Sequence, residues 1–513
     1  MLGPFLGALL GGRPIVIVSN REPWIHRRAE DGGPPRVERP ASGLVSALEP
    51  LAEASGGTWI AHGIGSADRL VVDGQDAVAL PPGRPRYRLR RLWLSAEQVR
   101  GYSTHLANRG LWPLCHLAFV EPEFDPDHWR TYRQVNELFA RAVLEETPAQ
   151  GAMVFLQDFH LALVPSLLKR ARPSLTVAQF WHVPWPPAEQ LRACPYSGEL
   201  IEGLLGNDLL GFQTGEHCRH FLEAVERFAP ADAMPRPRGA GGASPEPEVL
   251  VPSLPAGHVT RIGSFPISID FDAWSGPAGQ PEALEAMALW RRQLGLEDCP
   301  LGIGIDRLDY TKGLAQRLRA VDLLLERHPD WRGRLRFLQL VAPARDGIAL
   351  YGSLRRDLEQ LVARINRRWR QGSWYPLLFL QERRGPLELL ALHRLAAFCL
   401  VSSLDDGMNL VAKEFVASRC DGDGVLILSR HAGSARELEG ALLVNPFAVE
   451  ELAEAMHGAL TMEEPLRRAR MARMRSQVRE HNVYHWAATL LGEAAQAVRH
   501  AGPQALSLAG GEG

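Results

Sequence analysis

The chain has few cysteines, no long apolar run and almost no net charge. Its six cysteines include no Cys-x-x-Cys pair, which excludes a disulfide scaffold or structural zinc site and is typical of a reducing cytosol. No apolar run approaches the roughly 20 residues that a membrane helix needs. Fifty-seven Lys plus Arg against 59 Asp plus Glu leave a net charge of −2, which argues against binding to nucleic acid or to a membrane surface. We therefore expect a cytoplasmic protein.

Lysine is also scarce, since only Lys169, Lys312 and Lys413 contribute to the 57 basic residues. A genome that favours arginine codons explains the bias. A lysine that remains in such a chain indicates a place where a compact ammonium suits better than a planar guanidinium.

Short apolar runs alternate with longer amphipathic stretches along the chain. Hydrophobic residues make up 46% and charged residues 23%, as in ordinary globular proteins. The apolar runs predict buried strands at 15–19, 153–157, 176–181, 208–212, 259–269, 301–305, 335–341, 377–380, 398–402 and 425–428. Strands of this kind, separated by helices, favour parallel sheets covered on both faces.

We predict an α/β protein with two doubly wound, Rossmann-like domains, because the strands are too many for one sheet and a break separates two sets. The first domain is expected at 14–272, with a flexible Pro- and Gly-rich insertion at about 229–255. The second is expected at 273–480, followed by a helix at 481–502 that packs back on the first domain. Domains of this type face each other across a cleft that holds a ligand, which indicates a nucleotide-handling enzyme.

The segment 304–313 (GIDRLDYTKG) follows a predicted strand and leads into a predicted helix. Arg307 and Lys312 lie on this loop, so two cations and free backbone N–H groups can hold a diphosphate. The alternative is a solvated loop with incidental basic residues.

The segment 405–414 (DDGMNLVAKE) occupies the same kind of place after another strand. The turn is expected to face a phosphate with the backbone N–H groups of Gly407, Met408, Asn409 and Leu410. Glu414 lies further into the helix, where it can accept hydrogen bonds from a ribose, and Asp406 can bind sugar hydroxyls. An ordinary capped helix is the alternative.

Two strands of the first half end in Asp158 and in His182, which can orient sugar hydroxyls or assist proton movement. Arg21 ends the first strand, and Arg345 has a similar position in the second domain, so both suit a second phosphate on an acceptor. Trp59 and Trp112 can stack on sugar faces. Burial in the core is the alternative for the aromatic, His and Asp side chains.

Eight motifs in order resemble the trehalose-6-phosphate synthases, which are retaining glycosyltransferases of the two-domain Rossmann type, the GT-B architecture. They are SNR (19–21), LWP (111–113), DFH (158–160), WHVPWP (181–186), DLLGFQT (208–214), RLDYTKGL (307–314), DGMNLVAKE (406–414) and NPF (445–447). The similarity extends from residue 15 to about 486, apart from the insertion.

The resemblance implies a glucosyl transfer from a nucleoside diphosphate glucose, with UDP-glucose the expected donor, to glucose 6-phosphate. The implied donor ligands are Ser42, Gly43, His182, Arg307, Lys312, Asp406, Val411 and Glu414, with the other residues of the 407–411 turn. The implied acceptor ligands are Arg21, Trp112, Asp158 and Arg345, and Tyr102 replaces a family tyrosine that aligns with Ser103. Of these, Arg307, Lys312, His182 and Asp158 are expected to act in the chemical step. No metal or other cofactor is implied.

This chain departs from the family pattern at three places. Gln157-Asp-Phe-His160 stands where His-Asp-Tyr-His is usual, Asp405 stands where Arg is usual, and Ser103 stands where a tyrosine is usual. The Arg21-Glu-Pro23 segment is similar to the glucosylglycerol-phosphate synthases, which share most donor motifs. Another phosphorylated acceptor, such as glycerol 3-phosphate, therefore remains an alternative. A silent regulatory homologue that binds sugar phosphate is a third hypothesis, against which the intact Arg307 and Lys312 argue. The base of the donor and a homo-oligomeric assembly stay open.

Overall fold

The computed structural model describes residues 7, 11–39, 43–236, 247–255, 257–296, 299–343 and 349–504. The chain divides into two compact units. The N-terminal unit runs to Pro266 and includes the chain from Tyr484 onward, and the C-terminal unit is Ile267–Val483. The predicted boundaries stood after residues 272 and 480.

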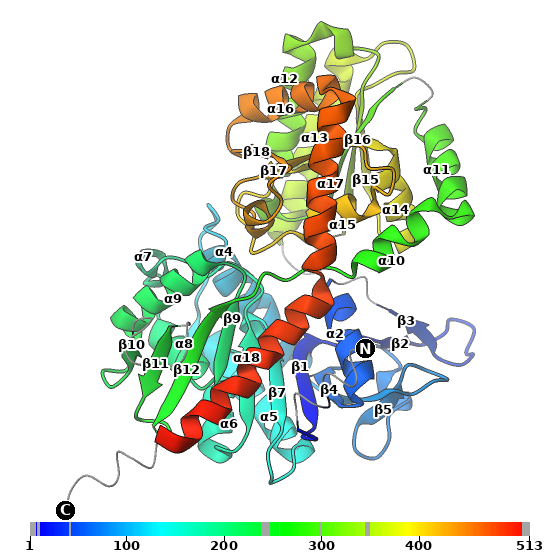
Figure 1. The fold of residues 1–513 in the computed structure, drawn as a ribbon. Helices are drawn as coiled ribbons and strands as arrows, with labels where there is room; N and C mark the ends of the chain where they lie inside the picture. The colour runs from blue at the N-terminus through cyan, green and yellow to red at the C-terminus, as the bar shows by residue number, and fades with distance from the viewer. Residues whose placement is uncertain are drawn as a thin grey trace, which may run out of the picture. The chain divides into compact units, whose positions relative to one another are not determined.

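The N-terminal unit is built on one ten-stranded sheet (Figure 1). Its strand order is β10-β11-β12-β9-β8-β7-β1-β4-β6-β5. The parallel strands are β1 (Ile15–Arg21), β4 (Thr58–His62), β6 (Tyr87–Leu92), β7 (Met153–Gln157), β8 (Thr176–Phe180), β9 (Leu209–Phe212) and β12 (His258–Ser264). Antiparallel strands β5 (Ala77–Leu80), β10 (Met234–Arg236) and β11 (Glu248–Val251) extend the two edges.

The predicted flexible insertion at 229–255 is wrong at its two ends. These ends form β10 and β11, which pair with each other, and β11 also pairs with β12. The middle of the insertion, 237–246, lies outside the described residues. The Pro- and Gly-rich composition misled the prediction because it belongs to the connection between two short edge strands.

Helices flank this sheet, the longer α-helices being α2 (Gly43–Ser55), α5 (Pro126–Glu146), α6 (Val164–Ala171), α8 (Ser197–Leu204), α9 (Gly215–Phe228) and α18 (Val483–Gln504). The last of them is red in Figure 1. Its Trp486 packs on the sheet. Its ring centroid lies 6.0 Å from that of Phe155 and 5.1 Å from that of Phe180. The end of the chain therefore covers strands β7 and β8 of the N-terminal unit.

The C-terminal unit has a six-stranded, wholly parallel sheet in the order β15-β14-β13-β16-β17-β18. Its strands are β13 (Leu301–Arg307), β14 (Arg336–Ala342), β15 (Leu377–Gln381), β16 (Ala396–Val401), β17 (Val425–Ser429) and β18 (Leu442–Val444). The helices are α10 (Phe271–Ser275), α11 (Pro281–Gln293), α12 (Leu314–Arg327), α13 (Ala349–Trp369), α14 (Pro386–Leu395), α15 (Leu410–Ser418), α16 (Val449–Thr461) and α17 (Glu464–Glu480).

Apolar side chains fill both faces of this sheet. Leu338 and Leu340 belong to one buried cluster, whereas Phe337 and Val341 of the same strand belong to the other. Burial on both faces explains the near-continuous apolar runs in the sequence. All the strands predicted from those runs are present, with ends shifted by a few residues.

Each sheet reverses its winding direction once. In the N-terminal unit the chain builds β1, β4 and β6 toward one edge, then returns to the other side of β1 with β7. In the C-terminal unit it builds β13, β14 and β15, then returns to the other side of β13 with β16. The loops at such a reversal leave in opposite directions, so ligands of doubly wound proteins bind outside the carboxyl ends of those two strands.

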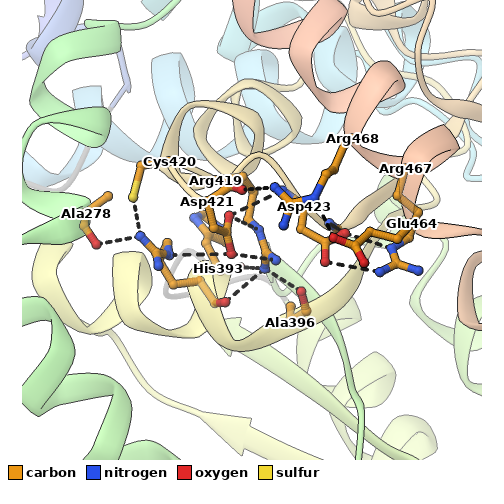
Figure 2. A network of polar contacts seen from close by, with 12 residues as sticks. Ala278, His393, Ala396, Arg419, Cys420, Asp421, Asp423, Glu464, Arg467 and Arg468 are labelled. Atoms are coloured by element: carbon orange, nitrogen blue, oxygen red, sulfur yellow. Dashed lines mark hydrogen bonds and ion pairs between the residues drawn. The ribbon is translucent and has the colours of Figure 1, made fainter.

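A network of arginines and aspartates holds the loop between α15 and β17 (Figure 2). The Nη1 of Arg419 donates to the carbonyls of His393, Arg394 and Ala396, at 3.0, 2.9 and 2.5 Å. Its Nε donates to Asp421 at 3.1 Å, and Arg467 binds the nearby Asp423. The network lies before the start of β17, on the edge of the sheet away from the strands' carboxyl ends, and fixes the C-terminal end of α15.

Replacing Arg419 by Met should loosen this edge of the C-terminal unit. The carbonyls at the end of α14 would lose their buried donor, at a cost of about 1–3 kcal/mol for each group left without a partner. Hydrogen exchange followed by mass spectrometry should then show faster amide exchange over residues 393–424. Arg319→Met, at an exposed position of α12, is the matched control. Equal protection in both variants would show that the network carries no stability.

Candidate active site

Hydrogen bonds hold the loop after β13 in a short turn that ends at Lys312. Asp309 caps a short 3₁₀ turn, because its Oδ1 accepts hydrogen bonds from the N–H and the hydroxyl of Thr311, both at 3.0 Å. Gly313 follows with φ 61°, and a Cβ there would clash with the carbonyl oxygen of Ser402. The turn into α12 therefore requires glycine.

Lys312 meets the second predicted motif directly. Its Nζ lies 2.5 Å from Oδ2 of Asp406, which also accepts from Ser403 Oγ at 3.0 Å and Asn409 Nδ2 at 3.1 Å. The N–H of Leu404 donates to the carbonyl of Thr311 at 2.7 Å. The structure thus brings together two segments 94 residues apart, at the point where the sheet reverses.

The start of α15 is a well-built helix N-terminus. Asn409, with φ 81°, caps it by accepting from the N–H of Ala412 at 3.1 Å. The carbonyl of Met408 accepts from the N–H of Ser434 at 2.9 Å, and Gly433 packs too closely on the carbonyl of Gly407 to carry a Cβ. The first-turn residues Leu410 and Val411 are half-buried. Such a nine-residue helix can bind an anion at this end.

Two neighbouring residues on α15 differ in their surroundings. Lys413 is buried, with its Nζ 2.6 Å from Oε2 of Glu437 and 2.8 Å from the carbonyl of Ile267, so it anchors the helix. Glu414 is half-buried, and burial raises the pKa of its carboxyl to about 7. It can therefore offer either a carboxylate or a protonated carboxyl near neutral pH.

Of four other predicted site residues, the structure describes two. Arg307 is the last residue of β13 and is exposed. Gly43 is the first residue of α2. Ser42 and Arg345 lie outside the described residues.

In the N-terminal unit, Asp158 and His182 lie together at the ends of β7 and β8. Asp158 has φ 70°, and its Oδ1 accepts from the N–H of His182 at 3.2 Å. Nε2 of His182 lies 2.9 Å from Oε1 of Gln157, and burial lowers the pKa of this histidine to about 3. The imidazole is therefore neutral, and Gln157 occupies its Nε2.

Arg21 ends β1, the strand next to β7, so the sheet reversal places it and Asp158 after neighbouring strands. The pairing of β1 with β4 shifts between Ser19 and Arg21, which is the geometry of a β-bulge and changes the direction of a side chain. Ser19 Oγ donates to the carbonyl of Arg21 at 2.7 Å, and Trp59 Nε1 donates to Ser19 at 2.8 Å.

The aromatic residues predicted to contact the acceptor are all buried. Trp59 is 0% exposed, so it supports Ser19 from behind instead of offering a face to a ligand. Tyr102 is also 0% exposed, packed between Tyr132 and His160 at ring distances of 5.7 and 5.8 Å. Burial raises the pKa of Tyr102 well above its ordinary value. The structure gives both of them core positions.

Trp112 begins α4 (Trp112–Cys115) and is 5% exposed. Its ring centroid lies 4.0 Å from that of His116 and 6.2 Å from that of Phe159, the residue after Asp158. This contact places it beside the Asp158 loop.

Sequence reasoning missed a set of buried charged groups next to Arg21. They are Glu22, His26, His62, Asp68 and Arg91. Of these residues, only Glu22 belongs to a segment that stood out in the sequence, Arg21-Glu-Pro23.

Among the described residues, no group of three or more His, Cys, Asp or Glu side chains is arranged to hold a metal ion. Within the same residues, no helix is long and apolar enough to cross a membrane.

Residues 13–496 match the family model of glycosyltransferase family 20. A UDP-forming alpha,alpha-trehalose-phosphate synthase from Pichia angusta is 34% identical over 488 residues, covering 93% of this chain and 98% of the relative. A solved synthase of the same type from Burkholderia xenovorans, in complex with glucose-6-phosphate, is 31% identical with a TM-score of 0.80. That likeness covers 94% of this chain and 100% of the other. A structure from E. coli, bound with UDP-2-fluoro glucose, is 29% identical with a TM-score of 0.81. That likeness covers 94% of this chain and 99% of the other.

Glu414→Gln should change how the stability of the protein depends on pH. The unfolded carboxyl releases its proton near its ordinary pKa of 4.5, whereas the folded one keeps it up to about pH 7. The folded state therefore binds more protons between these values, and the free energy of unfolding falls as pH rises through this window. The slope from this group is at most about 1.4 kcal/mol per pH unit.

Urea unfolding of both proteins between pH 4.5 and 7.5 measures this difference. The Gln variant should lose less stability with rising pH than the unmodified protein. Glu450→Gln, at an exposed position of α16, should leave the slope unchanged. Parallel curves for the Glu414 variant and the unmodified protein would contradict the assignment.

Proposed function

Because the chain belongs to glycosyltransferase family 20 and has its two Rossmann-like domains, we propose that it transfers glucose from UDP-glucose to glucose 6-phosphate. The products are trehalose 6-phosphate and UDP. One observation carries the proposal at the level of residues: Lys312, Asp406 and the start of α15 lie together at the reversal of the second sheet. This is where a doubly wound domain binds a nucleotide.

On the donor side, Arg307 and Lys312 neutralise the diphosphate and the charge that grows on it as it leaves. Backbone N–H groups from Gly407 to Val411 face its phosphates, and Glu414 accepts from the ribose. Asp406 binds glucose hydroxyls. Hydrogen bonds from the bound sugar then replace part of the interaction between this carboxylate and Lys312. Ser42 and Gly43 complete the donor side.

On the acceptor side, Arg21 and Arg345 bind the phosphate of glucose 6-phosphate. Asp158 orients the acceptor hydroxyl, and Trp112 borders the sugar. His182 forms a hydrogen bond with the donor glucose through the nitrogen that Gln157 leaves unoccupied. A histidine with its pKa lowered to about 3 stays neutral here and does not act as a base.

The acceptor hydroxyl attacks the face from which UDP departs, and the leaving phosphate takes its proton. The new bond joins the acceptor oxygen to the anomeric carbon as the bond to the phosphate oxygen breaks. Catalysis by this route needs positioning and charge neutralisation in place of a carboxylate nucleophile. The polar residues at both sheet reversals can supply this positioning and charge neutralisation.

Glycerol 3-phosphate is a second candidate acceptor. Ser103 at the place of a family tyrosine and the Arg21-Glu-Pro23 segment favour it, since both differ from the family pattern on the acceptor side. The neighbouring Tyr102 is buried. A cytosolic location suits either activity, because all six cysteines lie in the described part of the chain and none of them forms a disulfide there.

Release of nucleoside diphosphate separates these possibilities. UDP-, GDP- and ADP-glucose are each incubated with glucose 6-phosphate and with glycerol 3-phosphate, and the product is identified by NMR. We expect UDP release that depends on glucose 6-phosphate. If neither acceptor stimulates release from any donor, the proposed activity is wrong and the regulatory alternative stands.

Arg307→Ala should lower kcat on the order of 10²–10³-fold, because one of two cations at the departing diphosphate is removed. Steady-state kinetics with saturating donor and acceptor measures the effect. Arg319→Ala, an exposed arginine of the same unit, serves as the control. A normal kcat for the Arg307 variant would refute its role.

A further inference from the structure

Next to Arg21 lies a cluster of buried ionisable side chains that the proposed reaction does not use. Its members come from five places in the N-terminal unit and are at most 9% exposed: Glu22 after β1, His26 in β2 (Ile25–Arg27), His62 at the end of β4, Asp68 in a 3₁₀ turn and Arg91 in β6. Burying charges is costly unless each one is paired. A cluster of this size beside a proposed ligand residue requires an explanation.

Arg91 is the centre of the cluster. Its Nε donates to Oε2 of Glu22 at 2.7 Å, and its Nη2 lies 3.1 Å from Oδ1 of Asp68. The same Nη2 donates to the carbonyl of Trp24 and to Nδ1 of His26, both at 2.9 Å. One guanidinium therefore joins the chain on both sides of residue 23 to the turn at Asp68.

Glu22 connects the cluster to the neighbouring loop. Its Oε1 accepts from the N–H of Ile64 at 2.9 Å, while Asp68 accepts from the N–H of His26 at 2.8 Å. Two points in the segment after β1 are thus tied to the chain that follows β4. The segment cannot move without breaking buried hydrogen bonds.

Arg21 is anchored from the other side as well. The bulge before it is held by Ser19, which donates to the carbonyl of Arg21 and accepts from Trp59. Arg21 itself is exposed while Ser19, Trp59 and Glu22 are buried. The guanidinium is therefore carried on a main chain that is fixed immediately before and after it.

We propose that Glu22, held by Arg91, is a positioning residue for the phosphate of the acceptor: it fixes the main chain that carries Arg21. This inference rests on the proposed function. It also explains the Arg21-Glu-Pro23 segment, because a glutamate at this place is used inward, toward Arg91 and Ile64.

The charges of the cluster make this anchor sensitive to pH. Burial, with a further contribution from Asp68, raises the pKa of Glu22 to about 8. Burial alone would raise the pKa of Asp68 too, but hydrogen bonds from His26 and Glu22 hold it below its usual range. Burial lowers the pKa of His62 to about 4, so that imidazole adds no charge near neutral pH.

At neutral pH the two carboxyl groups therefore carry one negative charge opposite the single charge of Arg91. As pH rises through about 8, Glu22 loses its proton and two buried carboxylates compete for one guanidinium. Relative to an opened segment whose Glu22 ionises near its ordinary pKa of 4.5, the anchored state loses stability up to about pH 8 and no further above it. The KM for the sugar phosphate should therefore rise toward pH 8 and then level off, while the KM for the nucleotide sugar stays constant.

Kinetics of Glu22→Gln test the proposal, since glutamine has a similar shape and does not titrate. Its NH2 group cannot accept one of the two hydrogen bonds that Glu22 receives from Arg91 and Ile64, so its KM for glucose 6-phosphate should be raised at every pH. In the unmodified protein, the KM for glucose 6-phosphate should increase severalfold as pH rises from about 7 to 8 and should level off above that. The Gln variant should show a flat profile. Glu38→Gln, which alters an exposed ion pair with Arg27, should keep the profile of the unmodified protein.

Arg91→Met supplies a second, stronger change. It should raise the KM for glucose 6-phosphate about tenfold or more at all pH values, equivalent to about 1.4 kcal/mol, with little change in the KM for UDP-glucose. Circular dichroism checks that the variants fold. If Arg91→Met does not fold, the kinetics of Glu22→Gln alone test the proposal.

Three results would overturn the proposal. They are an unchanged pH profile in Glu22→Gln, equal effects on both KM values, and a loss of thermal stability with no kinetic change. Failure of the proposed function is recognised separately, because the unmodified protein would then neither turn over nor bind glucose 6-phosphate in calorimetry, and the inference would fall with it.

Discussion

A doubly wound parallel sheet sends the chain away from its central pair of strands in opposite directions, so the loops after those two strands stay side by side and uncovered by helices. In the C-terminal unit this pair is β13 and β16, and their loops bring Lys312 within 2.5 Å of Asp406. In the N-terminal unit the pair is β1 and β7, which end at Arg21 and just before Asp158. The polar groups of both units depend on this reversal, because nothing in their sequence separation brings them together.

The loops at the reversals adopt backbone conformations that ordinary residues avoid. Asp158 has φ 70° and Asn409 has φ 81°. Such conformations persist only where surrounding contacts hold them. Asp158 is held by the N–H that it donates to Phe180 and by its contact with His182, and Asn409 is held as the cap of α15. At the other end of α15, the Arg419 network fixes the helix against the sheet.

The surroundings of the three lysines give a physical reason why lysine is retained there in an arginine-rich chain. Each is buried and pairs with one carboxylate: Lys169 with Asp208 at 2.7 Å, Lys312 with Asp406 at 2.5 Å and Lys413 with Glu437 at 2.6 Å. Lys169 and Lys413 also donate to backbone carbonyls. A compact ammonium can donate in several directions within a small space, where a planar guanidinium would not fit.

The amino-acid sequence alone determined the fold class, most central strands and the donor motifs, because strands buried on both faces leave long apolar runs and phosphate-binding turns follow them directly. It did not reveal β6, whose YRLRRL pattern resembles a charged surface segment, or the burial of Trp59 and Tyr102. Only the tertiary structure decided that Arg91 lies beside Glu22, 69 residues away, with neither exposed to solvent. Pairing between distant charges follows from strand order and register, and local sequence patterns do not encode which face of a strand turns toward which partner.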